Sequence, residues 1–196
     1  MFVRSLALGV AAAALLAGGA QAADLIIPTT PVPIYEAAGF DWEGLYAGVE
    51  IGGLFHGEGI VPGTLDDSTQ GVVGGIVGVN FMVADPILVG LEVQGDYVWG
   101  NGQDAGLFLA LARVGAVVTD QVLVYAAGGV GVLTRGGASD GVYALGAGVE
   151  FAVTDSVSVR GEVLGLGDFS TAAGGGLGPD DFFESAKATV GVFYHF

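Results

Sequence analysis

One short turn sequence occurs three times in this chain at a constant spacing. Val83-Ala84-Asp85, Val118-Thr119-Asp120 and Val153-Thr154-Asp155 follow one another at intervals of 35 residues. A constant interval of this size indicates a repeated structural unit. On both sides of each turn, apolar residues alternate with polar or small ones, which is the period of a β-strand. The repeat therefore predicts three β-hairpins, with Asp85, Asp120 and Asp155 at their turns.

The alternation also predicts how the strands of each hairpin pair. If each Asp is the centre of a three-residue turn, apolar residues face apolar residues across the hairpin, and polar or small residues face each other. The expected facing pairs are Phe81 with Val89, Gly78 with Glu92, Val114 with Ala126, Arg113 with Ala127, Phe151 with Val159, and Glu150 with Arg160. The same turn sequence is thus expected to set the register of all three hairpins.

Eight segments of about 12 residues show this alternation. They are residues 44–55, 71–83, 87–99, 106–118, 122–133, 142–153, 157–168 and 184–196. A tilted strand needs ~9–11 residues to cross a bilayer, whereas strands of globular proteins average ~5–6. The longest apolar runs of these segments, such as Val122–Leu133, are too short for a transmembrane helix, which needs ~20 residues. The strand length therefore favours a barrel in a membrane.

The two faces of these strands differ in chemistry. One face is apolar along most of its length, and the other carries charged residues and many of the 37 glycines. A soluble barrel or sandwich would need a charged outer face, but only 13% of the residues are charged. A closed barrel in lipid requires an apolar outside and a polar or small inside. The sequence predicts an all-β fold, an eight-stranded antiparallel up-and-down transmembrane β-barrel.

Eight charged residues are expected to point into this barrel. They are Glu50, Glu92, Asp96, Arg113, Glu150, Arg160, Glu162 and Lys187. Charges in a low-dielectric interior must be paired or hydrated, and an eight-stranded barrel is just wide enough for side chains to fill. We expect a structural ion-pair network, with a selective conduction path as the alternative. The inward glycines leave open a small ligand cavity.

Aromatic residues and connections differ between the two ends of the predicted strands. Trp42, Phe81, Phe151, Tyr194 and Phe196 are expected at one end, and Phe55, Tyr97, Trp99, Phe108, Tyr143, Phe169 and Phe182 at the other. Two such belts are typical of lipid interfaces. Three connections are tight turns and four are longer, residues 56–70, 100–105, 134–141 and 169–183. The longer ones are acidic, which indicates either a solvated rim or divalent-cation contact with surface lipid; short turns are expected on the periplasmic side.

The N-terminal region has the features of an export signal. Residues 1–22 combine Arg4, a short apolar stretch and a small-residue cleavage site, Ala20-Gln21-Ala22. The apolar stretch is short for a membrane anchor. Residues 23–41 contain three prolines and are predicted to be an extended periplasmic lead-in. The barrel domain is then expected over residues 42–196.

Charge and residue types exclude several classes of function. The net charge of −16 argues against nucleic acid and against an anionic membrane surface as partners. Without cysteine there is no disulfide or thiolate metal site. His56 and His195 are far apart in the sequence, and no catalytic triad or metal cluster is predicted. We expect no enzyme activity and no cofactor.

Several motifs resemble those of the small outer-membrane barrels of Gram-negative bacteria. These include Trp42-Glu-Gly-Leu-Tyr46-Ala-Gly48, the stretch from Gly146 to Glu162, and the Phe193-Tyr194-His195-Phe196 end. The family includes opacity-type, haemin-binding and porin-labelled surface proteins. The resemblance implies an outer-membrane location, and it implies that Tyr194 and Phe196 form the signal read by the barrel-assembly machinery. The chain departs from the pattern at Val79, where a Tyr is usual, and in its short acidic loops.

Together these features predict a non-enzymatic outer-membrane barrel with a structural or surface role in the cell envelope. Its expected partners are outer-membrane lipid and, during insertion, the assembly machinery. Two alternatives stay open: a surface protein that binds haemin or a small hydrophobic ligand, and a narrow porin-like solute channel. The oligomeric state is not predicted.

Overall fold

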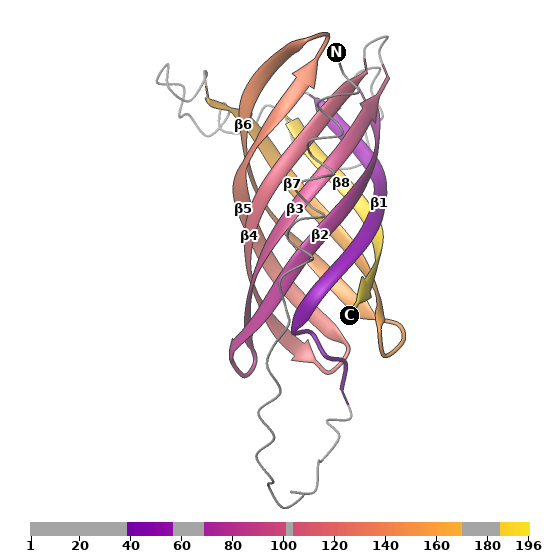
Figure 1. Ribbon diagram of the computed structural model, residues 1–196, viewed down its shortest axis with the longest axis vertical. Helices are drawn as coiled ribbons and strands as arrows, with labels where there is room; N and C mark the ends of the chain where they lie inside the picture. Colours follow the sequence, from indigo (N-terminus) through magenta and orange to yellow (C-terminus); the bar gives the residue numbers. More distant parts are fainter. Residues whose placement is uncertain (1–38, 57–68, 101–103, 170–184) are drawn as a thin grey trace, which may run out of the picture. The chain divides into compact units, whose positions relative to one another are not determined.

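The chain folds into a closed barrel of eight strands (Figure 1). This computed structural model describes residues 39–56, 69–100, 104–169 and 185–196, all within one compact unit, residues 37–196. The strands are β1 (Gly44–His56), β2 (Gln70–Ala84), β3 (Ile87–Trp99), β4 (Ala105–Thr119), β5 (Val122–Arg135), β6 (Ala138–Ala152), β7 (Val157–Asp168) and β8 (Ser185–His195). No helix in the described ranges is long and apolar enough to cross a membrane.

Each strand pairs antiparallel with the next, and β1 closes the barrel by pairing with β8. The predicted fold class, an eight-stranded up-and-down antiparallel barrel, is confirmed. The predicted register is confirmed in all three hairpins, as the pairs Gly78–Glu92, Arg113–Ala127 and Glu150–Arg160 show. Alternation and turn position are therefore enough to set the pairing of these strands.

The turns at Asp85 and Asp120 are tighter than the three-residue turns expected, whereas residues 153–156 separate β6 from β7 at Asp155. β2 and β3 are joined by Asp85 and Pro86, and β4 and β5 by Asp120 and Gln121. A register shift just before each turn, between Met82 and Ala84 in the first hairpin, absorbs the extra residue. This is the behaviour of a β-bulge, and it leaves the rest of the ladder in the predicted register. We call this end of the barrel, at the bottom of Figure 1, the turn end.

The connection between β5 and β6 corrects the sequence prediction. Residues 134–141 were expected to form one of the longer loops, but the two strands continue to Arg135 and Ala138. Gly136 and Gly137 alone make the turn, with φ of 57° and 93°. Two successive residues with positive φ match the twist of a hairpin, and only glycine adopts them at low cost. The hairpin rises at the opposite end, which we call the loop end (Figure 1).

The other long connections lie mainly outside the described residues. This holds for residues 57–68, 101–103 and 170–184, and so for most of the acidic side chains assigned to the loops. It also holds for the export signal and for residues 23–38. Of the predicted lead-in, Phe40 is described, and its ring lies 4.5 Å from the ring of Trp42 and 4.8 Å from that of His195. The last residues of the lead-in thus pack against the turn end of the barrel.

The outer face of the barrel is apolar and exposed. Its exposed large side chains include Leu45, Val49, Ile51, Val77, Phe81, Leu91, Val93, Val114, Val130, Leu145, Phe151, Val163, Val190 and Tyr194. The aromatic residues lie near the strand ends as predicted, with one correction. Trp42 is only 2% exposed, because it packs under Phe40 and His195 inside the turn end. Phe182 lies outside the described residues.

Candidate functional site

The barrel interior, or lumen, gathers every charged residue that was predicted to point inward. All eight are buried, and they come from β1, β3, β4, β6, β7 and β8. They project inward because successive side chains of a strand point to opposite faces, and each charged residue lies on the face opposite the apolar one. Closure of the barrel then brings residues from non-adjacent strands within contact distance.

Two arginines and two glutamates form the central cluster. Arg160 lies 2.6 Å from Glu92 and 3.0 Å from Glu150. Arg113 lies 3.5 Å from Glu150 and 3.7 Å from Glu92, and it donates to the amide oxygen of Asn80. Each carboxylate thus meets both guanidinium groups, so the four charges balance within one buried group.

Aromatic rings enclose these guanidinium groups. The Arg113 guanidinium carbon lies 4.6 Å from the centre of the Tyr46 ring and 4.9 Å from that of Tyr125. Arg160 lies 3.8 Å from the centre of the Phe193 ring. A cation over an aromatic face is attracted by the ring quadrupole, most strongly where water is excluded. The Tyr46 hydroxyl also donates to Glu92 at 2.5 Å, so the ring both packs and satisfies a charge.

Inward glycines leave the space that these rings occupy. A Cβ atom built on Gly78 would collide with the Tyr46 ring, and one on Gly148 would collide with the Tyr125 ring. Gly48 stands in the same relation to Phe193. The inward glycines had left a small ligand cavity open as an alternative. Each of these three glycines lies under an aromatic ring from a neighbouring strand, so the ring fills the space beside it.

A second cluster lies nearer the loop end. The Lys187 ammonium group lies 2.5 Å from both Glu50 and Asp96. Thr189 donates to the other oxygen of Glu50 at 2.7 Å. Gln94 connects the two clusters: its amide oxygen accepts from Lys187 at 2.7 Å, and its amide nitrogen donates to Glu92 at 2.7 Å. The lumen therefore holds one continuous polar network.

Glu162 is the exception to ion pairing in this network. Among the described residues it accepts hydrogen bonds from Tyr125 at 2.6 Å and from Gln94 at 2.9 Å, and no basic side chain forms an ion pair with it. The network has five carboxyl groups and three basic side chains. Hydroxyl and amide donors thus take the place of the missing cations.

The structure brings Ser158, His195 and Glu150 together, which sequence reasoning missed. The Ser158 hydroxyl lies 2.5 Å from Glu150 and 3.1 Å from the Nε2 atom of His195. The Glu150 carboxylate also contacts Nε2, at 3.1 Å. In a catalytic triad the acid contacts the opposite ring nitrogen from the one that activates the serine. Here both partners share one nitrogen, so the three residues do not have that geometry.

Apolar side chains close the lumen on both sides of the network. Leu54, Leu107, Leu109 and Leu164 fill it toward the loop end, and Leu88 and Leu123 fill it toward the turn end. These leucines were not predicted to fill the lumen, because the expected inward face was defined by charged residues and glycines. The sequence did contain a signal for them. Leu107, Leu109 and Leu111 lie an even number of positions before the inward Arg113, so they lie on the same face of their strand.

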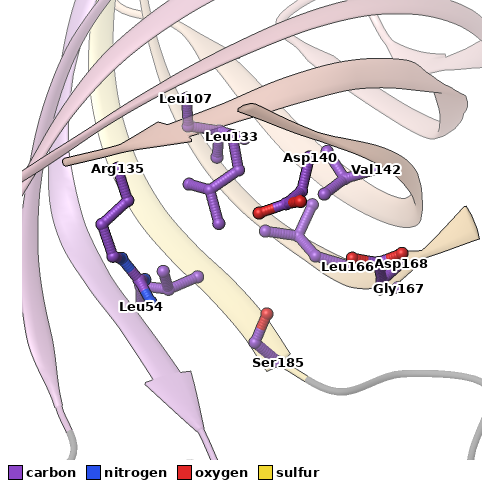
Figure 2. A pocket seen from close by; sticks show the side chains of 10 residues that line it. All are labelled: Leu54, Leu107, Leu133, Arg135, Asp140, Val142, Leu166, Gly167, Asp168 and Ser185. Carbon is purple, nitrogen blue, oxygen red and sulfur yellow. The ribbon is translucent and has the colours of Figure 1, made fainter. Parts of the chain in front are cut away.

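A cavity of about 270 Å³ lies above the leucines at the loop end (Figure 2). It is lined by Leu54, Leu107, Leu133, Arg135, Asp140, Val142, Leu166, Gly167, Asp168 and Ser185. Arg135 lies on β5 and Asp140 on β6, so the unexpected length of this hairpin places both residues in the lining. None of the lining residues was predicted as a site residue.

No family model matches this chain, and no curated protein sequence matches it. Solved structures do resemble it. Ail, the attachment invasion locus protein of Yersinia pestis, is 12% identical, with a TM-score of 0.52, over 79% of this chain and 99% of Ail. The N-terminal β-barrel domain of Pseudomonas aeruginosa OprF is 13% identical, with a TM-score of 0.48, over 77% of this chain and 97% of that domain.

Neisserial surface protein A is likewise similar, at 12% identity and a TM-score of 0.48, over 78% of this chain and 97% of its own. At such low identities a likeness shows the fold alone. The resemblance to Ail therefore supports the closed antiparallel barrel and carries no ligand or partner to this chain.

Proposed function

We propose that this protein is an integral outer-membrane barrel with a structural or surface role in the cell envelope, and that it is not an enzyme. The observation that carries the proposal is the inverted distribution of side chains. Large apolar residues are exposed all around the outer face, and eight charged residues are buried inside. This is the arrangement that lipid requires of a barrel.

This outer face would be energetically unfavourable in contact with water. Val49, Ile51, Leu91 and Val93 are each about 60% exposed, and their neighbours on every strand are apolar as well. Soluble monomers rarely expose contiguous apolar patches beyond a few hundred Å². In a bilayer, hydrocarbon surrounds these side chains and removes the free-energy cost of exposing them to water. The tight turns at Asp85, Asp120 and Asp155 are then the periplasmic ones, as short turns are in outer-membrane barrels.

The filled lumen argues against the channel alternative. The central network is closed by leucines on both sides, and aromatic rings occupy the space beside Gly48, Gly78 and Gly148. Water-filled porins use ~16–18 strands, whereas eight leave room only for a packed interior. The ion-pair network is therefore proposed to be structural.

We expect purified, refolded protein to show no open steps of porin size in a planar bilayer. The reason is that the buried side chains of Leu54, Leu107 and Leu164 fill the lumen toward the loop end. Single-channel recording of the parent checks this. Steps that recur in the parent and become larger in Leu164→Ala would come from the lumen and would support a channel instead.

The absence of an enzyme mechanism is proposed from geometry. Ser158 is buried, and its hydroxyl shares a single histidine nitrogen with Glu150. A nucleophile needs access to substrate and a base oriented by a third group. Ser158, Glu150 and His195 instead form hydrogen bonds with one another at the turn end, under the rings of Phe40 and Trp42.

Haemin binding is the other alternative function, and the size of the cavity at the loop end argues against it. Its volume of about 270 Å³ is too small to enclose a haemin macrocycle. Titration of haemin into the folded protein, followed by its absorption spectrum, separates this role from a structural one. A saturable spectral shift at one equivalent would favour haemin binding.

The chain end is proposed as the assembly signal. Phe196 is 78% exposed on the outer face, and its ring lies 5.1 Å from that of Tyr194. Its backbone N–H donates to the carbonyl of Leu45 at 3.0 Å, which extends the pairing of β8 with β1. The last residue thus offers an exposed aromatic side chain to an assembly factor, while its backbone N–H is held by β1.

Deleting Phe196 is expected to lower the amount of assembled protein in the outer membrane several-fold, with little change in refolding yield in detergent. An exposed side chain contributes little to packing, so a large effect in cells would come from recognition. The gel mobility of unheated samples reports the folded fraction. Phe81→Ala, which removes another exposed aromatic side chain at the same end, is the control. Equal assembly of the deletion and the parent would contradict the proposed signal.

A further inference from the structure

The cavity at the loop end has an apolar floor and charges of opposite sign on opposite sides (Figure 2). The floor is made by Leu54, Leu107, Leu133, Val142 and Leu166. In the view of Figure 2, Arg135 lies to the left, and the carboxylates of Asp140 and Asp168 lie to the right of Leu133. This separation of charge across an apolar surface is absent from the network deeper in the lumen, where unlike charges are in contact.

Arg135 differs from the other basic residues of the barrel. Arg113, Arg160 and Lys187 each pair with two carboxylates. Within the described part of the chain, Arg135 forms no ion pair, and its Nε atom is buried without a hydrogen-bond partner. A buried donor left unsatisfied costs free energy that an anionic ligand group would recover. The guanidinium group is therefore placed to receive a carboxylate or a similar planar anion.

The facing wall is suited to a cation. Asp168 lies opposite Val142 in the ladder of β6 and β7, and Asp140 is two residues from Val142 on the same strand and face. Two carboxylates on this side of the cavity attract an ammonium group. Ser185 adds a hydroxyl that both donates and accepts.

We propose that this cavity binds a small zwitterion with an apolar body, such as an apolar amino acid or a dipeptide. Its ammonium group lies near Asp140 and Asp168, its carboxylate near Arg135, and its aliphatic part on the leucines. The cavity of about 270 Å³ has the volume of about nine waters, which suits a molecule of this size. The inference does not depend on the structural role proposed above, because a barrel that does not conduct can still bind a ligand at its mouth.

The experiment compares three forms of one dipeptide by isothermal titration calorimetry. Leucyl-leucine carries both charges, its N-acetyl form keeps only the carboxylate, and its amide keeps only the ammonium group. The folded barrel is held in a maltoside detergent, because a zwitterionic detergent would compete. We expect leucyl-leucine to bind about tenfold more tightly than either blocked form, since each blocked form loses one charge-assisted contact.

Two variants assign the two ends of the ligand. Arg135→Gln is expected to abolish the preference for leucyl-leucine over the amide, and Asp140→Asn to reduce the preference over the N-acetyl form. Asp120→Asn, at the turn end, changes the net charge equally and is expected to leave both preferences intact. Gel mobility shows that each variant is folded.

Some results would overturn the proposal. No heat of binding for the parent, equal affinity for all three ligands, or unchanged preferences in both variants would each do so. A second source of the same chemistry is a zwitterionic lipid headgroup. If vesicles of phosphatidylcholine suppress dipeptide binding and vesicles of phosphatidylglycerol do not, the zwitterion site stands and its natural ligand is the headgroup.

Discussion

Replacing Arg160 with Ala is expected to lower the free energy of unfolding by about 3–5 kcal/mol. The change leaves Glu92 and Glu150 buried with only Arg113 to balance them, and it also empties the space over the Phe193 ring. Breaking a buried pair costs more than the pair contributes, because an uncompensated charge stays behind. Urea titration of protein refolded into lipid vesicles, followed by gel mobility, measures the effect.

The coupling between Arg160 and Glu150 distinguishes a lost ion pair from lost packing. The double variant Arg160→Ala with Glu150→Gln is expected to be more stable than Arg160→Ala alone, since the unpaired charge is gone. Arg135→Ala is the matched control, because the structure describes no ion pair for that arginine, and we expect a change of less than about 1 kcal/mol. A double variant no more stable than Arg160→Ala would show that the two residues are not coupled.

Replacing Gly78 with Val is expected to destabilise the barrel by about 3 kcal/mol or more, at the upper end of what overpacking costs. The added side chain would occupy the position of the Tyr46 ring, which lies directly over the glycine. Moving that ring also breaks its hydrogen bond to Glu92 and its contact with Arg113. The same urea titration in vesicles measures the loss.

Gly75→Val provides a control on the same strand. Gly75 faces outward, and a Cβ built there meets nothing within 4 Å. We expect that variant to be neutral or more stable, because a β-branched residue suits an exposed strand position better than glycine. Adding Tyr46→Ala to Gly78→Val is expected to recover part of the lost stability. Equal effects of the two valine variants would contradict the filling of inward glycine positions by rings.

Pairing along neighbouring strands was predictable from the sequence because it depends on local information. The turn position and the period of two determine which residue faces which, so Glu150 was placed opposite Arg160 and the structure agrees. The closed barrel followed from the number of strands and from two faces of different chemistry. The β5–β6 hairpin was missed although Gly136-Gly137 is a recognised turn signal, because its polar flanks were taken for a loop.

Contacts across the lumen were not predictable in the same way. Lys187 and Glu50 are 137 residues apart, and Arg160 and Glu92 are 68 apart. Which inward side chains meet depends on the stagger of the strands at closure, and no local pattern encodes that stagger. The same holds for Arg113, which lies between the rings of Tyr46 and Tyr125 from two other strands.

The sequence by itself determined the strands, their register in the three hairpins and the inward direction of the charged residues, since each follows from neighbours along the chain or across one turn. Only the tertiary structure decided that aromatic rings fill the space beside Gly48, Gly78 and Gly148, that leucines close the lumen, and that the cavity at the loop end separates Arg135 from two carboxylates. These features arise where side chains from non-adjacent strands share one enclosed volume. Their arrangement is therefore a property of the closed barrel, because it is set by packing and charge balance across the lumen.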